Sequence, residues 1–167
     1  YGATIKTGED VISIEKEEEL FKIKTHTQDY LGKTVVLSTG STYRQLGIPG
    51  EADLIGSGVH FCATCDGAFY REKDIIVIGG GNSALEEGIF LAGFCKSVKI
   101  VHILPEFTAS ETYTEKLSSV KNISTYLNKK SLEFIADENG IFKGVKIEDN
   151  ETKNQEVLHA DGVFVFI

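Results

Sequence analysis

Residues 74–84 read DIIVIGGGNSA, an apolar run that ends in three glycines. The run 74–78 consists mainly of isoleucine and valine, which predicts a strand buried on both faces. Residues 82–95 then carry small and apolar side chains at helical spacing, and 98–102 is again a strand-like run. This order predicts a βαβ unit with two parallel strands, so the centre of the chain indicates a Rossmann-like α/β domain.

The glycine-rich turn has the spacing of a dinucleotide-binding loop. Gly79 permits the tight turn, Gly81 lets the backbone approach a pyrophosphate, and Ala84 lets the helix pack closely on the strand. The free amides at the start of the helix, at Asn82 and Ser83, are suited to hold the phosphates. A tight strand-to-helix turn without any ligand is the alternative interpretation.

The end of the second strand of this unit bears on which dinucleotide is bound. His102 stands where an NAD-type site has an acidic residue and an NADP-type site has arginines nearby. Glu106 is close in sequence but displaced, and a carboxylate there would repel a 2′-phosphate. Glu87, which we expect in the first turn of the helix, suits the helix dipole. We count His102 and Glu87 among the candidate cofactor-binding residues.

Cys62 and Cys65 form a Cys-x-x-Cys pair, and Asp66 follows directly. Such a pair can form a small-loop disulfide, and a neighbouring carboxyl can exchange protons with a thiolate. Two alternatives stay open: half of a zinc site that includes His60, or two inert core thiols. Only Cys95 remains as a further zinc ligand, and its helical position favours a small apolar role, so we predict no metal site.

Composition limits the classes of partner. The 167 residues carry 17 Lys and Arg against 25 Asp and Glu, a formal net charge of −8, which argues against nucleic acid or an anionic membrane as the main partner. No apolar run approaches the roughly 18 residues of a membrane span, and three cysteines are too few for a secreted disulfide scaffold, so we expect a cytoplasmic protein. The lack of methionine and the start at Tyr1 lead us to expect a piece of a longer chain.

Strand-like runs lie on both sides of the central unit. In the N-terminal part they span residues 11–14, 20–24 and 34–38. Glycines and Pro49 cluster in 41–58, which predicts a linker between domains. After a polar helix at 109–119, we expect a β-meander that leads back to a terminal strand at 163–167. Its strands are expected at residues 122–127, 131–137, 142–149 and 155–159.

Three motifs together resemble the low-molecular-weight thioredoxin reductases, a class II family of pyridine nucleotide-disulfide oxidoreductases, and their flavoprotein relatives. Residues 58–69, GVHFCATCDGAF, are similar to the redox signature of that family, and 79–87, GGGNSALEE, to its pyridine-nucleotide loop. Residues 38–40, STG, with 46–51, LGIPGE, resemble the stretch where the FAD domain passes into the nucleotide domain. The resemblance covers essentially the whole chain.

The resemblance implies a division of the chain and a set of binding roles. Residues 58–167 would form a pyridine-nucleotide-binding domain that carries the Cys-x-x-Cys motif. Residues 1–57 would be a partial β segment of an FAD domain together with the linker. Thr39 and Gly40 would contact FAD, which the full-length protein would bind with motifs that lie outside this chain. A homodimer is expected for the full-length protein.

The resemblance further implies the chemistry of the cysteine pair. Electrons from a reduced flavin would pass to the Cys62–Cys65 disulfide, with Cys65 next to the flavin. Cys62 would attack the disulfide of a thioredoxin or a similar small dithiol protein. Asp66 would donate and accept the protons that this exchange requires.

One part of the family pattern is missing. Relatives that use NADPH carry a His-Arg-Arg stretch and a further arginine, where this chain has His102, Ile103, Leu104 and Thr108. Each lost charge-assisted contact to a phosphate is worth about 1.5–3 kcal/mol, so we expect NADPH to be disfavoured, which leaves NADH or a ferredoxin as the donor. The alternative functions are a non-catalytic dinucleotide-binding domain, a zinc-stabilised interaction domain, and a relative of the peroxide-reductase flavoproteins.

Overall fold

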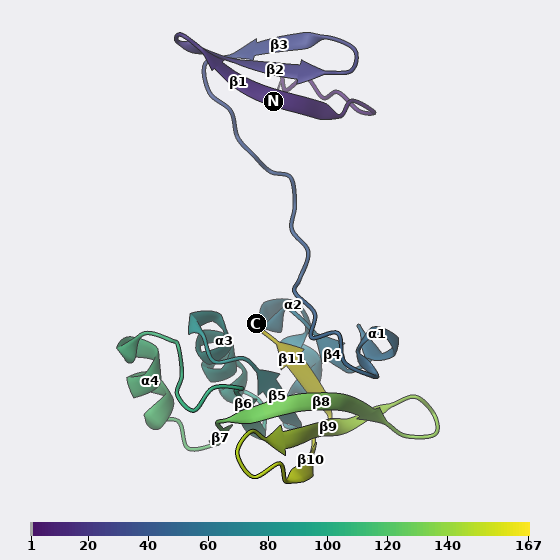
Figure 1. Cartoon of the computed structure of the whole chain (residues 1–167), viewed down its shortest axis with the longest axis vertical. Helices are drawn as coiled ribbons and strands as arrows, with labels where there is room; N and C mark the ends of the chain where they lie inside the picture. The colour runs from purple at the N-terminus through teal and green to yellow at the C-terminus, as the bar shows by residue number, and fades with distance from the viewer. Residues whose placement is uncertain (1) are drawn as a thin grey trace. The chain divides into compact units, whose positions relative to one another are not determined.

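The computed structural model describes residues 2–167 and divides the chain into two compact units (Figure 1). The first unit ends at Thr42, and the second spans Tyr43–Ile167. This division falls within the predicted linker 41–58, but residues 43–57 fold as part of the second unit. The assignment of residues 1–57 to an FAD domain stays a prediction, because compactness alone does not test it.

The first unit is a three-stranded antiparallel sheet in the order β1-β2-β3. Its strands are β1 (Val11–Glu17), β2 (Leu20–Thr25) and β3 (Asp29–Gly32). The first two strands confirm the prediction from the sequence. None of residues 2–42 is fully buried, so within the described chain this sheet has no closed core of its own.

The strand predicted at 34–38 is wrong. This segment has no regular structure, and Val36 and Leu37 are 88% and 72% exposed. A continuous apolar run is stable as a strand only when hydrogen-bonded neighbours and packing layers surround it. No strand among residues 2–167 pairs with this run, so its apolar character does not produce a strand here. The third strand of the unit is instead β3, which alternates exposed and half-buried residues.

The second unit is built on a five-stranded parallel sheet in the order β4-β11-β5-β6-β7. Its strands are β4 (Val59–His60), β5 (Asp74–Ile78), β6 (Ser97–Val101), β7 (Ile123–Tyr126) and β11 (Gly162–Val165). Alternate residues of β5 enter two different cores: Ile75 and Val77 lie in one, Ile76 and Ile78 in the other. Both faces of this central strand are covered, which explains its continuous apolar sequence.

Different elements cover the two faces of the parallel sheet (Figure 1). One face carries the helices α3 (Asn82–Ala92) and α4 (Glu111–Ser118), which bury Leu85 and Leu117. The other face carries an antiparallel sheet in the order β10-β9-β8, which contributes Phe134 to the second core. The strands of this sheet are β8 (Lys129–Ala136), β9 (Phe142–Asp149) and β10 (Gln155–His159).

Three short helical turns precede β5. They are α1 (Glu51–Leu54), α2 (Ala63–Asp66) and the 3₁₀ helix η1 (Gly67–Tyr70). The longest helix of the described chain, α3, has 11 residues. None of the helices within residues 2–167 is both long and apolar enough to cross a membrane.

The predicted grouping of residues 122–127 with the meander is wrong. The segment forms β7 and pairs in parallel with β6. The connection between these two strands contains α4, and a helical crossover returns the chain parallel to the strand that it left. The strands β8 to β10 do form a meander, after which the chain returns to β11 inside the parallel sheet. The predicted α/β class is confirmed, with an antiparallel layer added on one face.

The turn before α1 is fastened by a buried carboxylate. Glu51 is 2% exposed, and its side chain accepts hydrogen bonds from the amides of Leu46 at 3.0 Å and Gly47 at 2.6 Å. Next to it, the amide of Phe134 in β8 donates to the carbonyl of Pro49. Because these bonds fix the turn against the antiparallel sheet, this part of the predicted linker is a structured part of the second unit.

Replacing Glu51 with alanine should lower the free energy of unfolding of the second unit by about 3 kcal/mol, because two amides lose their charged acceptor. Glu51→Gln keeps one acceptor oxygen and should cost less. Asp53→Ala, exposed in the same helical turn, is the matched control and should change stability by less than about 0.5 kcal/mol. Urea titration followed by circular dichroism measures the three values, and equal losses in Glu51→Ala and Asp53→Ala would contradict the role assigned to Glu51.

Candidate functional site

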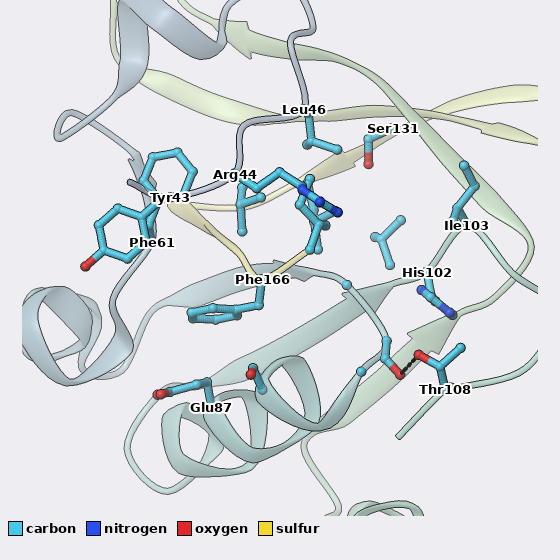
Figure 2. Close-up of a pocket in the computed structure, with 18 of the residues that line it drawn as sticks. Tyr43, Arg44, Leu46, Phe61, Glu87, His102, Ile103, Thr108, Ser131 and Phe166 are labelled. Carbon is cyan, nitrogen blue, oxygen red and sulfur yellow. Dashed lines mark hydrogen bonds between the residues drawn. The ribbon is translucent and has the colours of Figure 1, made fainter. Parts of the chain in front are cut away.

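A cavity of about 850 Å³ opens at one edge of the parallel sheet (Figure 2). Much of its lining comes from residues at, or directly after, the carboxyl ends of β5, β6 and β11, and β8 adds a further wall. These four segments are residues 78–83, 101–103, 165–167 and 129–131. The crevice at the carboxyl ends of parallel strands is where ligands bind in open α/β sheets, so this cavity is the candidate site.

The three glycines of the loop differ in what a side chain at each position would contact. At Gly79 the backbone has φ +136°, and a Cβ there would collide with the carbonyl of Phe166. At Gly80 a Cβ would collide with the ring of His102. At Gly81 the nearest atom lies 3.8 Å from such a Cβ, so a side chain there would meet open space at the cavity wall. The protein itself requires Gly79 and Gly80, whereas Gly81 leaves room for a ligand.

The start of α3 is open toward the cavity. Gly81 is its N-cap, and no side chain among the described residues caps the helix. The Asn82 side chain instead accepts a hydrogen bond from the amide of Ser110 at 2.7 Å. Asn82 and Ser83 line the cavity, while Ala84 is fully buried and packs beneath the loop. The amides of the first turn are therefore free to bind an anion.

His102 lines the cavity and has a buried ring nitrogen without a hydrogen-bond partner among the described residues. Its ring is 8% exposed, lies over Gly80 and stacks on Phe107 with the ring centroids 6.0 Å apart. Nε2 has no hydrogen-bond partner among the described residues, and burial lowers the pKa of the imidazole, which favours the neutral ring. Ser131 of β8, equally buried, presents a second unpartnered oxygen. Because buried polar atoms without a partner are costly, these two atoms are suited to a polar ligand.

These features together fit a nicotinamide dinucleotide. One cavity is lined by an open glycine, an uncapped helix start and two residues that each have an unpaired polar atom. Glu87 also lines it. Since α3 begins at Asn82, however, Glu87 lies in the second helical turn, and its predicted place in the first turn is wrong. Partial burial raises the pKa of the Glu87 carboxyl, and the charge of Glu86 raises it further.

The segment that follows His102, where the family resemblance leads us to look for arginines, is apolar and accessible. Ile103 and Leu104 are 51% and 45% exposed. Three cations reach the cavity from other segments, namely Arg44, Lys129 and Lys130. Lys129 is paired with Asp149 at 2.6 Å, whereas the Arg44 side chain extends into the cavity (Figure 2). Positive charge for a phosphate is therefore available from β8 and from the start of the second unit, not from residues 103 and 104.

Cys62 and Cys65 form a disulfide, with the Sγ atoms 1.98 Å apart and the Cα atoms 5.3 Å apart. Cys62 is the N-cap of α2 and Cys65 lies within it, so one helical turn holds the pair. Cys65 is exposed and Cys62 is half-buried. Phe61, the preceding residue, lines the cavity and stacks on Tyr43. The disulfide and the glycine loop therefore belong to the same compact unit.

The disulfide bears directly on the alternative interpretations of the cysteine pair. A zinc ion needs free thiolates, and both sulfurs are joined to each other. The third ligand of that alternative, His60, contacts Asp66 and Tyr70. Within residues 2–167, no three His, Cys, Asp or Glu side chains lie close enough to hold a metal ion. Asp66 is 35% exposed directly after the disulfide, which is suitable for proton exchange with solvent or a sulfur.

Some predicted residues lie elsewhere, and others were missed. Thr39 and Gly40 are exposed residues of the first unit and do not line the cavity, so their contact with FAD stays a prediction. The dinucleotide motif gives no role to Gly80, although a further glycine between Gly79 and Gly81 is a signal that the backbone there is closely approached. No local sequence pattern marks Ser131 or Arg44 as a site residue. Both lie far from the glycine loop in sequence, and they reach the cavity only because β8 and the start of the second unit fold next to it.

Cys95 should behave differently from the other two cysteines. It is 6% exposed, and burial raises the pKa of its thiol to about 11, so about one molecule in a thousand is a thiolate at pH 8. Alkylation of the oxidised native protein should label none of the three cysteines. Mild reduction should add labels on Cys62 and Cys65, and Cys95 should react only after denaturation. Peptide mass mapping measures this, and native labelling of Cys95 as fast as of Cys65 would contradict the assignment.

Comparisons with known proteins give consistent relatives. The sequence profile of the pyridine nucleotide-disulphide oxidoreductase family matches residues 1–167. One component of the alkyl hydroperoxide reductase of Staphylococcus aureus is 37% identical over 168 residues, covering 100% of this chain and 33% of that protein. The thioredoxin reductase of T. acidophilum is 32% identical with a TM-score of 0.80, covering 96% of this chain and 52% of that one. The thioredoxin reductase of Giardia duodenalis is 28% identical with a TM-score of 0.85, covering 95% and 52%.

The chain thus spans about a third of the length of the curated relatives and about half of the solved ones. The profile match covers the whole chain, and the similarity to solved structures extends over nearly all of it. The chain belongs to the pyridine nucleotide-disulphide oxidoreductase family and has the fold of the low-molecular-weight thioredoxin reductases.

Proposed function

We propose that the full-length protein is a flavoprotein disulfide reductase, and that this chain contains its nicotinamide-nucleotide site and its redox-active disulfide. The observation that carries the proposal is the Cys62–Cys65 disulfide, accessible at Cys65, in the same unit as the dinucleotide-like cavity. The family generally binds FAD and NAD(P)H. A domain that only bound a nucleotide would need neither a joined pair of cysteines nor an adjacent acid.

The residues of this chain have distinct proposed roles. When bound, FAD supplies two-electron transfer between the nucleotide and the disulfide. After reduction, Cys62 attacks the substrate disulfide, and Cys65 resolves the mixed disulfide that results. Asp66 exchanges protons with these sulfurs. The first-turn amides of α3 and the unpaired Nε2 of His102 bind and orient the nucleotide.

For the donor, we favour NADH over NADPH. Ile103 and Leu104 offer no charge-assisted contact to a 2′-phosphate, and Thr108 is bound to the carbonyl of Gly80. Arg44 lines the same cavity, and its side chain extends into it. It is therefore the cation best placed to contact a 2′-phosphate, which would weaken the preference for NADH. A ferredoxin that reduces the flavin directly is the alternative donor. In that case the cavity would not be needed for turnover.

For the acceptor, we favour a thioredoxin or a similar small dithiol protein. The alkyl hydroperoxide reductase component, which is 37% identical over the chain, favours a second candidate. In that case the full-length protein would reduce the disulfide of a peroxiredoxin, and the peroxiredoxin would reduce the peroxide. We further propose that the full-length protein forms a homodimer, as the family resemblance implies. We also propose that it is cytoplasmic, because a dithiol that must stay reducible suits a reducing compartment. Oxidised thioredoxin and an oxidised peroxiredoxin, each given to the reduced full-length protein, separate the two candidates by rate. Cys62→Ser should abolish either reaction.

The donor preference is tested by anaerobic stopped-flow reduction of the flavin in the full-length protein. NADH should reduce it at concentrations at least about tenfold below those that NADPH requires. The 2′-phosphate of NADPH, which NADH lacks, must be desolvated without arginine contacts that are each worth about 1.5–3 kcal/mol. Restoring cations with Ile103→Arg and Leu104→Arg together should narrow or reverse this ratio. Rapid reduction by micromolar NADPH in the wild type would contradict the preference. Reduction by ferredoxin but by neither nucleotide would support the alternative donor.

Gly81→Ala tests the nucleotide site separately from the fold. The backbone of Gly81, at φ −85° and ψ −178°, is one that alanine adopts, and the space is open, so the variant should fold like the parent. Its affinity for NADH should fall at least about tenfold, because the added methyl occupies the place of the pyrophosphate. Gly79→Ala, which collides with the Phe166 carbonyl, should instead lose thermal stability. Calorimetric titration with NADH measures the first effect, and unchanged binding by Gly81→Ala would contradict the assigned site.

A further inference from the structure

A buried imidazole precedes the disulfide by two residues, and the proposed function does not use it. His60 ends β4 and is 7% exposed. Its ring stacks on Phe164 of β11 with the centroids 5.2 Å apart, and Tyr70 of η1 packs edge-on against both rings. His60 and Phe164 are also partners in the pairing of β4 with β11. Backbone pairing and aromatic packing together fix the orientation of the imidazole.

Both nitrogens of this imidazole have a side-chain partner. Nδ1 lies 3.2 Å from Oδ2 of Asp66, and Nε2 lies 2.7 Å from the hydroxyl of Tyr70. Asp66, His60 and Tyr70 therefore form a continuous polar chain from a partly exposed carboxyl into the core. A histidine kept only for packing would not need a titratable group on each side.

Tyr70 closes the inner end of this chain. Burial raises the pKa of its phenol, and the negative charges of Asp66 and Asp161 raise it further. The phenol stays protonated and can either donate to Nε2 or accept from it. A Cβ at Gly162 would collide with the Tyr70 ring, so that glycine leaves the space in which the ring lies. Proton exchange with the sulfurs must therefore take place at the Asp66 end.

We propose that His60 is a positioning residue for Asp66: it holds the carboxyl in one orientation and shares a proton with it, so that the pair stores the proton that Cys62 loses and returns it during disulfide exchange. The inference rests on the proposed function. The shared proton has two positions, on the carboxyl beside a neutral ring or on the ring beside a carboxylate. Both keep the contact between the two groups and the total charge of the pair, so the proton can move between them without creating a net charge.

The exchange balances within the chain and its substrate. As the Cys62 thiolate forms, its proton moves to the Asp66–His60 pair. The thiolate attacks the substrate disulfide, a bond from Cys62 to one substrate sulfur forms, the substrate S–S bond breaks, and the departing sulfur takes the stored proton. Cys65 then attacks the Cys62 sulfur, the mixed disulfide breaks, and the proton of Cys65 passes to the second substrate sulfur. The dithiol loses two electrons and the substrate gains them.

Two further charged groups lie near the inner end of the polar chain, at Tyr70. Beyond Tyr70 lie Asp161, which precedes β11, and Lys73, whose Nζ is 5.4 Å from the centre of the Tyr70 ring. β11 contributes only an uncharged aromatic ring to the packing of the imidazole. Among the ion pairs of residues 2–167, Asp66 has one partner, and that partner is His60. His60 is thus the side chain that is placed to orient the Asp66 carboxyl.

The first test follows the pH dependence of exchange between the reduced full-length protein and two disulfides, oxidised thioredoxin and oxidised glutathione. His60→Asn keeps an amide donor near the place of Nδ1 but cannot take up a proton. Its rate at pH 7.5 should be about tenfold lower, and the decline of the rate at high pH should begin about one pH unit lower than in the wild type. His159→Asn removes an exposed histidine of β10 as a matched control and should keep the wild-type profile.

The outcomes separate the inference from the proposed function. A His60→Asn profile that coincides in shape with the wild type would overturn the inference and leave the reductase function intact. A wild-type dithiol that reacts with neither disulfide would overturn the function, and the inference with it. Recovery of the wild-type profile in His60→Asn by added imidazole would support the proton role, because a purely structural defect would not respond to a diffusible base.

A second measurement needs no folded variant of His60. Histidine-selective ¹⁵N labelling of the full-length wild type allows the titration of His60 to be followed by NMR in the oxidised and the reduced states. The midpoint should differ between the two states by more than about 0.5 pH unit, because reduction adds a titrating thiol to the coupled pair. Tyr70→Phe identifies the signal, since Nε2 loses its partner while the ring packing stays. Equal midpoints in both redox states would overturn the inference.

Discussion

The parallel alignment of β5, β6 and β11 is the constraint on which the rest of the second unit depends. Parallel neighbours end at the same edge, so the residues that follow them meet there: the glycine loop after β5, His102 after β6 and Phe166 after β11. The central place of β5 is possible because its side chains alternate between two cores, with helices on one face and an antiparallel sheet on the other. The cavity is a product of this arrangement, not of the loop alone.

The contacts at this edge also explain why three adjacent glycines are not equivalent. Gly79 packs against the carbonyl of Phe166, which follows β11, and Gly80 packs against the ring of His102, which follows β6. Each of these two glycines is therefore required by a neighbouring strand. Gly81 is tied to neither and begins α3. The same unit carries the disulfide on a single turn of helix, which ends at Asp66. Binding and redox groups therefore share one framework, and the aromatic packing of His60 attaches the redox turn to the parallel sheet itself.

Much of this could be predicted from the sequence wherever the signal was local. The strand, glycine loop and helix at 74–92 follow from periodicity and turn chemistry. The spacing of Cys62 and Cys65 allows a disulfide, and the family resemblance implies one. The failures are non-local. The run 34–38 has the composition of a buried strand but no neighbours among the described residues, and the segment around Ile123 required knowledge that a helical crossover places it beside β6. Ser131 reaches the site only because an entire antiparallel layer folds over the sheet, which no short window of sequence reveals.

The exposure of Ile103 and Leu104 has an evolutionary consequence. Neither side chain belongs to either core, so amino-acid changes at these positions cost the fold little. His102, by contrast, is constrained by its packing on Gly80 and Phe107. Under the proposed function, substitutions in this two-residue stretch can therefore change the preference between NADH and NADPH, while the packing of His102 is retained. Coenzyme preference and stability of the fold would then depend on different residues.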